Sequence, residues 1–257
     1  AARTLWYQIM NERYDFDDFR CGRMRFHTQT AGVTLTAQQS TNNIVRVAYQ
    51  ALASVLGGTQ SLHTNGYDEA LGLPTEESAK VALRTQQIIA HEIGVVDHVD
   101  PLGGAPLIEE MTSNIISEAR NVIESIDAHG GSVEAVKAGI QARMIHESAW
   151  IQQNELEDNL QRVIGVNLHV EEEGKYPAGQ VIDDQAIERQ ISKLSNHRSA
   201  RNNTEVQNAL QVLRLAVSGD DNLIDPIRGA CKSGATIGEI CGILRDGLGT
   251  WTAPGGI

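Results

Sequence analysis

The chain has 257 residues and a mass of 27.9 kDa, enough for one large domain or two smaller ones with a sizeable core. Apolar residues make up 41% and charged residues 21%, so the composition excludes disordered and fibrous proteins. A formal charge of −12 argues against nucleic acid as the main partner. No apolar run reaches the roughly 18 residues of a membrane span, and three scattered cysteines favour a reducing, cytoplasmic setting.

Two short β-compatible runs, residues 24–30 and 59–65, alternate with helical patterns in the first hundred residues. They contain the related triplets His27-Thr28-Gln29 and His63-Thr64-Asn65, which lie about one strand–helix unit apart. Consecutive units of this kind predict an α/β fold, here the last strand–helix units of a (β/α)8 TIM barrel. A doubly wound parallel sheet fits the same spacing, so this alternative stays open.

A helix is predicted after each of these strands. Apolar side chains recur at helical spacing over residues 44–56, and the preceding Asn42 and Asn43 are candidate N-caps. The second helix begins after the candidate cap Thr75 and ends near Gly94. Two glutamates lie in its first turn, where negative charge suits the helix dipole.

Alternation along each strand produces one polar face. His27 and Gln29 share a face of the first strand, and Ser61, His63 and Asn65 share a face of the second. If the opposite faces pack on helices, these five side chains point into the barrel. Because barrel interiors are usually filled by Val, Ile and Leu, we expect water or a ligand to occupy this axis.

The pattern changes near residue 97, where we place a domain boundary. Residues 1–97 are predicted to be a C-terminal portion of the barrel, and residues 98–257 a mainly helical linker or interface region. A turn-rich connector over residues 100–106 begins the second region. The elements predicted after it are a helix over 108–126, a helix capped by Ser132 with Val133, Val136, Ile140 and Met144 on its apolar face, a strand over 162–167, and helices over 183–194, 204–217 and 237–244.

A complete barrel needs about eight strand–helix units, and only about two precede the connector. The chain also begins without a methionine. We therefore expect this sequence to be one piece of a larger polypeptide.

Three segments closely resemble the coenzyme B12-dependent acyl-CoA mutases, the family of methylmalonyl-CoA mutase. These segments are His27–Thr36, Gly57–Asn65 and Asp68–Thr75. Further matches are Asn42–Arg46, Arg84–Gln86, Asp100–Gly104 and Val163–Asn167. The resemblance implies the C-terminal part of a mutase large subunit.

The resemblance further implies an isomerase that rearranges the carbon skeleton of an acyl-CoA, such as methylmalonyl-CoA to succinyl-CoA, through a radical generated from adenosylcobalamin. In such enzymes the CoA thioester enters along the barrel axis, and a cobalamin-binding domain or small subunit covers the barrel. The cofactor supplies the radical chemistry while the protein positions the groups and excludes water. This chain would need that domain and the remaining barrel half, would form a homo- or hetero-oligomer, and would be inactive alone.

The resemblance also assigns roles to individual residues. Gln29 corresponds to the amide near the adenosyl group and His27 to its neighbour in the same strand, so both are expected to be catalytic. Ser61 corresponds to a hydroxyl that faces the substrate. Glu69 matches an acidic residue that meets the adenosyl ribose or the corrin. The positions expected to contact the corrin ring are Gly32, Gly72 and Leu73.

Structural roles compete with these assignments and stay open. His27 and His63 also fit satisfied core histidines, Gln29 fits a cap of backbone groups, and the glycines fit turns. The stretch from Asp127 to Ser132 lacks the last glycine of the family's cobalt-binding motif. We interpret His129 within it as a helix stop and expect no metal ligand in this chain.

Two other functions are considered. His27, His63 and His91-Glu92 would suit a metal-dependent barrel hydrolase if they met at strand ends. Alternatively, the helical region from about residue 107 would make this a non-catalytic fragment for subunit interaction. If the chain belongs to a mutase, the sequence does not distinguish among four substrates: methylmalonyl-CoA, ethylmalonyl-CoA, isobutyryl-CoA and 2-hydroxyisobutyryl-CoA.

Overall fold

The computed structural model describes residues 1–172 and 183–253. Contacts within the chain divide it into two compact units, Ala1–Gln180 and Val181–Ile257.

The boundary predicted near residue 97 lies inside the first unit. Helix α1 (Ala2–Arg13) packs on α4 (Pro106–Ala128), and the guanidinium of Arg120 donates hydrogen bonds to Glu12 across this contact, the shorter at 2.7 Å. This contact joins residues from both sides of the predicted boundary. Where the barrel of the complete protein would end stays a prediction.

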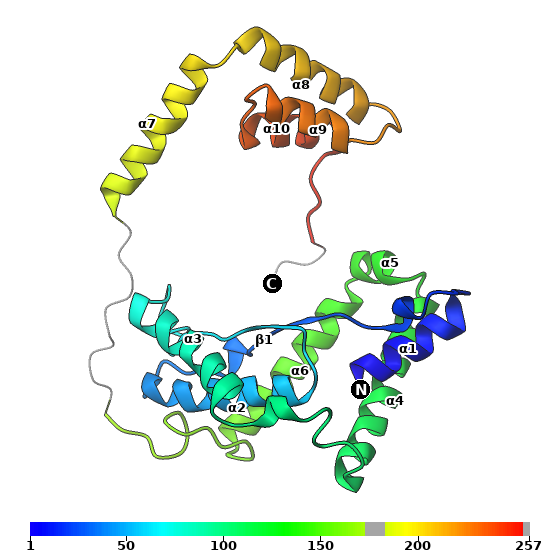
Figure 1. Ribbon diagram of the computed structural model, residues 1–257, viewed down its shortest axis with the longest axis vertical. Helices are drawn as coiled ribbons and strands as arrows, with labels where there is room; N and C mark the ends of the chain where they lie inside the picture. Colours follow the sequence, from blue (N-terminus) through cyan, green and yellow to red (C-terminus); the bar gives the residue numbers. More distant parts are fainter. Residues whose placement is uncertain (173–182, 254–257) are drawn as a thin grey trace. The chain divides into compact units, whose positions relative to one another are not determined.

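A two-stranded parallel sheet lies in the first unit (Figure 1). Strand β1 (His27–Gln29) pairs with β2 (Ser61–His63). The two predicted strands are confirmed, although each is shorter than its β-compatible run. Among the described residues these are the only strands, so the structure is a mixed, mainly helical α/β arrangement and does not show a barrel.

The two helices predicted between and after the strands are confirmed as α2 (Asn43–Leu56) and α3 (Glu76–His91), which pack on each other. The hydroxyl of Thr75 accepts a hydrogen bond from the Ser78 amide and caps α3 as predicted. Asn42, one of the two predicted caps, occupies the N-cap position of α2, but its side chain makes no capping hydrogen bond.

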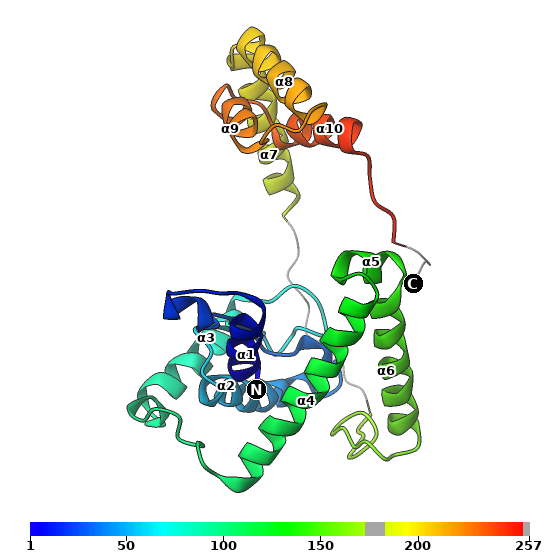
Figure 2. The ribbon, with the colours of Figure 1, turned by 90° about the vertical axis from the view of Figure 1, so that its right-hand side faces the viewer.

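The helix predicted to start at Ser132 is two helices, α5 (Ser132–Lys137) and α6 (Ile140–Glu157), with α5 at the corner between α4 and α6 (Figure 2). Gly139 separates them with a φ of +72°, in the left-handed region that favours glycine. The N-cap is Gly131 rather than Ser132.

The strand predicted over residues 162–167 is wrong, because the segment contains only an isolated bridge between Ile164 and Leu168. The carboxamide oxygen of Asn167 accepts a hydrogen bond from the Val163 amide at 2.7 Å. Its nitrogen donates to the carbonyl of Leu156, in the last turn of α6, and to the carbonyl of Gln161, beyond the helix. These local bonds fold the segment into a turn.

The second unit consists of the helices α7 (Asp184–Ala200), α8 (Asn203–Val217), α9 (Ile224–Lys232) and α10 (Ile237–Leu248). Its core cluster contains Val206, Leu210, Leu213, Val217, Ala230, Ile240 and Ile243. The three helices predicted here are confirmed as α7, α8 and α10. The sequence does not predict α9, because a proline and a glycine weaken its helical pattern.

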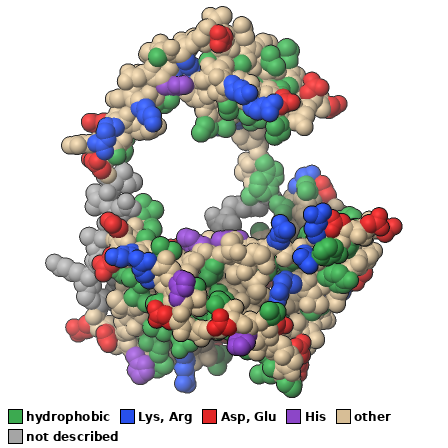
Figure 3. All heavy atoms as spheres, in the orientation of Figure 1, with side chains coloured by type: hydrophobic (Ala, Val, Ile, Leu, Met, Phe, Trp, Pro, Cys, Tyr) green, Lys and Arg blue, Asp and Glu red, His purple; other side chains and the backbone are tan. Residues whose placement is uncertain are grey.

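Apolar side chains are exposed on the surface of each unit (Figure 3). On α4, for example, Leu107, Met111 and Ile115 are each more than half exposed. None of the helices over residues 1–172 and 183–253 combines the length and the apolar character needed to cross a membrane.

An ion pair joins the turn between α7 and α8 to α10 in the second unit. The guanidinium of Arg201 donates to both carboxylate oxygens of Glu239, with Nη1 to Oε2 at 2.7 Å, and both side chains are largely buried. The hydrogen bonds from Arg201 hold the pKa of Glu239 far below its usual value, although partial burial acts in the opposite direction. Glu239 also completes a capping box with Thr236.

Glu239→Gln is expected to lower the Tm of the second unit by about 5 °C near neutral pH. Because folding depresses the pKa of Glu239, its stabilisation is complete above the ordinary value of 4.5 and is lost progressively as the pH falls below it. The variant should lose this part of the pH dependence. Thermal unfolding followed by the NMR amide signals of α10, at neutral and acidic pH, measures both effects.

The matched control is Asp225→Asn, which breaks an exposed ion pair with Arg228 in the same unit. It should leave the Tm almost unchanged, since exposed pairs contribute little. Equal shifts for the two variants would contradict the role given to Glu239.

Candidate functional site

The predicted polar side chains of β1 and β2 share one exposed face of the sheet. Because His27 lies opposite Ser61 and Gln29 opposite His63, all four side chains point the same way, and all four are exposed. The imidazole Nδ1 of His27 lies 2.7 Å from the Ser61 hydroxyl. The structure therefore brings together the two residues expected to be catalytic and the one expected to bind substrate. It does not place His27 opposite His63, although their triplets resemble each other.

Asn65 ties the carboxyl ends of the two strands together. Its side-chain oxygen accepts a hydrogen bond from Gln29 Nε2 at 3.1 Å, and its nitrogen donates to the Thr30 carbonyl at 3.0 Å. Its backbone amide donates to the Thr30 hydroxyl at 2.9 Å. The expectation that Asn65 faces the open polar side is wrong, because these bonds bury it to 2% exposure.

The loop after β2 carries Glu69, Gly72 and Leu73, three of the residues expected to bind the cofactor, and all three are exposed. Gly32, in the loop after β1, lies against this loop. A Cβ atom at Gly32 would come 3.0 Å from Asn65 Nδ2 and 3.3 Å from Glu69 Oε1. The close approach of the two loops therefore depends on the missing side chain at this position.

Asp68 anchors the loop after β2 to the start of α3. Its Oδ2 accepts hydrogen bonds from the Thr75 amide at 2.8 Å and from the Thr75 hydroxyl at 3.1 Å. Burial raises the pKa of this carboxyl, but nearby donors, chiefly the amide and hydroxyl of Thr75, outweigh that effect and hold the pKa below its usual value. A charged carboxylate thus fixes the backbone beside Glu69.

Asn43 joins the loops after both strands, and the sequence prediction misses this role. Its Oδ1 accepts a hydrogen bond from the Thr36 amide, while its Nδ2 donates to the carbonyls of Thr36 and Tyr67. A signal for this role is present in the sequence. Asn43 lies four residues before Val47, on the buried face of α2, where an unpaired amide would be costly.

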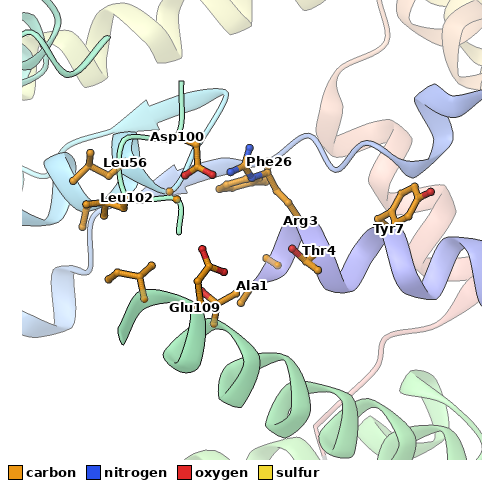
Figure 4. A pocket seen from close by; sticks show the side chains of 15 residues that line it. Ala1, Arg3, Thr4, Tyr7, Phe26, Leu56, Asp100, Leu102 and Glu109 are labelled. Carbon is orange, nitrogen blue, oxygen red and sulfur yellow. The ribbon is translucent and has the colours of Figure 1, made fainter. Parts of the chain in front are cut away.

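A hollow lies at the other ends of the strands, away from the loops after β1 and β2 (Figure 4). Its volume is about 660 Å³, and its lining includes Phe26, just before β1, and Leu56, the last residue of α2. Charged side chains from Arg3, Asp100 and Glu109 also reach it. None of the residues expected to bind cofactor or substrate lines this hollow.

The parts of the chain that the structure describes contain no group of three or more His, Cys, Asp or Glu side chains placed to hold a metal ion. His91 is the last residue of α3, whereas His27 and His63 lie on the sheet. His129 directly follows α4, and its ring nitrogen Nδ1 lies 2.6 Å from the Ser125 carbonyl, which suits the predicted helix stop.

Asn65→Ala is expected to lower the free energy of unfolding of the first unit by about 2 kcal/mol, because the buried Thr30 carbonyl loses its side-chain donor. Urea unfolding followed by amide signals of β1 and β2 measures the change. The exposed His63, replaced by alanine, serves as the control and should change stability by less than about 0.5 kcal/mol. A neutral Asn65→Ala would show that the strand ends are held by other contacts.

Comparison with known proteins places these features in a family. The family profile described as methylmalonyl-CoA mutase matches residues 1–250. The chain is 39% identical to methylmalonyl-CoA mutase of Rhizobium meliloti (strain 1021), covering 98% of this chain and 36% of that protein. It is 40% identical to the 2-hydroxyisobutanoyl-CoA mutase large subunit of Aquincola tertiaricarbonis, covering 98% and 45%. The chain thus spans less than half the length of these relatives. It belongs to the methylmalonyl-CoA mutase family.

Proposed function

We propose that this chain is part of an adenosylcobalamin-dependent acyl-CoA mutase, an isomerase that rearranges the carbon skeleton of an acyl-CoA thioester. In this proposal the chain contributes the last strand–helix units of a (β/α)8 barrel. It acts together with the remaining barrel half and a cobalamin-binding domain or small subunit. Family membership over residues 1–250 supports the reaction class.

The observation that carries the proposal is the single exposed polar face formed by His27, Gln29 and Ser61. An exposed strand face usually packs on further protein, yet these side chains offer hydrogen-bonding groups rather than apolar contacts. A thioester carbonyl and the hydroxyls of a nucleoside are ligands that such groups recognise. The face therefore suits a substrate channel better than a buried core.

The adjoining loops fit a corrinoid in their chemistry. Glu69 offers an exposed carboxylate that accepts hydrogen bonds from ribose hydroxyls, and Leu73 offers an apolar surface, 57% exposed, to a flat ring. At Gly72, no atom lies within 4 Å of where a Cβ would stand, so a broad ligand has room to approach the backbone. We propose that Gly32, Glu69, Gly72 and Leu73 hold the cofactor.

The proposed chemistry assigns positioning work to the protein. When bound, adenosylcobalamin supplies the radical that removes a substrate hydrogen. Gln29 orients the adenosyl group, held by its hydrogen bond to Asn65. His27 and Ser61 bind the thioester end of the substrate, and their mutual contact fixes the imidazole ring. The barrel around them excludes water from the reacting groups.

The proposed assembly is a homo- or hetero-oligomer, and its cytoplasmic location also stays a prediction. The exposed side chains of Leu107, Met111 and Ile115 on α4 favour a contact between subunits. The same exposed side chains support a second candidate function, in which the chain is a non-catalytic fragment that mediates contacts between subunits.

The complete enzyme, in which this chain is joined by the remaining barrel half and the cobalamin-binding domain, is expected to isomerise an acyl-CoA only when adenosylcobalamin is added. The 257-residue chain alone should show no turnover, because it lacks most of the channel. Chromatography of the CoA esters, with the methylmalonyl, ethylmalonyl, isobutyryl and 2-hydroxyisobutyryl thioesters as substrates, measures both. Isomerisation by the isolated chain would contradict the proposal. So would failure of the complete enzyme to isomerise any of the four thioesters.

In that enzyme, His27→Ala and Gln29→Ala are each expected to lower kcat/KM by about 100-fold, since each removes a preorganised hydrogen-bonding group. His91→Ala, at the exposed end of α3, is the control and should retain full activity. Initial rates with saturating cofactor measure the effect. Unchanged rates in the first two variants would remove these residues from the active site.

A further inference from the structure

We infer that Asn43 is a positioning residue that holds the loop after β1 and the loop after β2 in a fixed relation to each other. The inference rests on the proposed function in one respect: those two loops carry Gly32 on one side and Glu69, Gly72 and Leu73 on the other. Asn43 itself contacts neither substrate nor cofactor in this proposal. It acts through the backbone of the loops.

The geometry around Asn43 is that of a cross-link. The Thr36 amide donates to Oδ1 at 3.1 Å, and Nδ2 donates to the Thr36 carbonyl at 2.8 Å, so the side chain pairs with both backbone groups of one residue in the first loop. The same nitrogen donates to the Tyr67 carbonyl in the second loop at 2.9 Å. Asn43 is fully buried, so no water replaces these partners.

Arg46, one turn later on α2, reinforces this cross-link. Its Nη1 donates to Asn43 Oδ1 at 2.7 Å and to the Thr36 hydroxyl at 2.9 Å, and its Nη2 donates to the Ile164 carbonyl at 2.8 Å. The turn near residue 164 is thereby attached to the same point. Three segments that are distant in the sequence meet at one helical turn.

The position of Tyr67 in the chain makes this cross-link relevant to the site. Tyr67 directly precedes Asp68, whose carboxylate fixes the far end of the loop to α3. The segment that carries Glu69 is therefore attached at its start by the hydrogen bond from Asn43 to Tyr67. It is attached at its end by the hydrogen bond from the Thr75 amide to Asp68. Loss of the first attachment should loosen the cofactor-facing loops while the strands remain paired through their own ladder and Asn65.

Amide hydrogen exchange on the full 257-residue chain tests the cross-link without any cofactor. In Asn43→Ala, the amides of Thr36 and Leu71, one in each loop, should exchange about 10-fold faster relative to the amides of α3. The Thr36 amide loses its acceptor, and the turn in which the Leu71 amide donates to the Asp68 carbonyl loses its attachment at Tyr67. In Asn43→Asp, the acceptor for the Thr36 amide remains while both donors are lost. This variant should therefore loosen Leu71 more than Thr36.

Val47→Ala is the matched control. Val47 is buried one turn later on the same helix, but its apolar side chain forms no hydrogen bond with the loops. It destabilises α2 by removing apolar contacts. The exchange of Thr36 and Leu71 should then rise only in proportion to that of α3. If Asn43→Ala gives this same proportional pattern, the inference is overturned.

The second measurement uses the complete enzyme and equilibrium binding of adenosylcobalamin. Asn43→Ala should raise the Kd for adenosylcobalamin by about 10-fold, while the KM for the acyl-CoA stays within about 2-fold, because His27 and Ser61 sit on strands that Asn43 does not hold. Val47→Ala should change neither constant appreciably. An equal rise of both constants, or of neither, would overturn the positioning role.

The two proposals fail separately. A wild-type enzyme that binds no adenosylcobalamin refutes the proposed function, and the relative exchange rates of Thr36 and Leu71 then still decide whether Asn43 couples the loops. A wild-type enzyme that binds the cofactor, combined with unchanged loop exchange in Asn43→Ala, refutes the inference about Asn43 alone.

Discussion

The parallel pairing of β1 with β2 is the constraint on which the candidate site depends. Only three residues of each strand take part, but their register places His27 beside Ser61 and sends both following loops away from the same edge of the sheet. The polar face and the two loops are consequences of this one ladder. A register shifted by one residue would turn His27 and Gln29 toward the helices.

A ladder this short does not by itself hold the loops that follow it. In the first unit, buried amide side chains hold these loops. Asn65 donates a hydrogen bond to the Thr30 carbonyl just after β1, and Asn43 donates to backbone carbonyls of both loops. Each has its polar atoms paired, which is what makes a polar core residue stabilising rather than costly. The second unit uses a different device, an apolar cluster closed by the ion pair of Arg201 and Glu239.

Membership of the methylmalonyl-CoA mutase family gives these arrangements a functional reading. In the proposed enzyme, the residues with exposed functional groups differ from the residues that position them. His27, Gln29 and Glu69 are exposed and available to ligands, whereas Asn43 and Asp68 are buried and hold backbone. The segments that resemble the mutases contain residues of both kinds, among them the buried Asn43 on α2.

The sequence by itself determined the two strands, their sharing of a polar face, and helices α2, α3, α4, α7, α8 and α10, because period, capping and glycine stops are local signals. It also carried the family resemblance and hence the expected roles of His27, Gln29, Ser61 and Glu69. Only the tertiary structure decided what Asn43, Asn65 and Asp68 do, and that residues 162–167 form a turn. A buried amide or carboxylate looks the same in a sequence whether it caps a helix, faces a ligand or holds a loop. Its role depends on which backbone groups the fold brings within hydrogen-bonding distance.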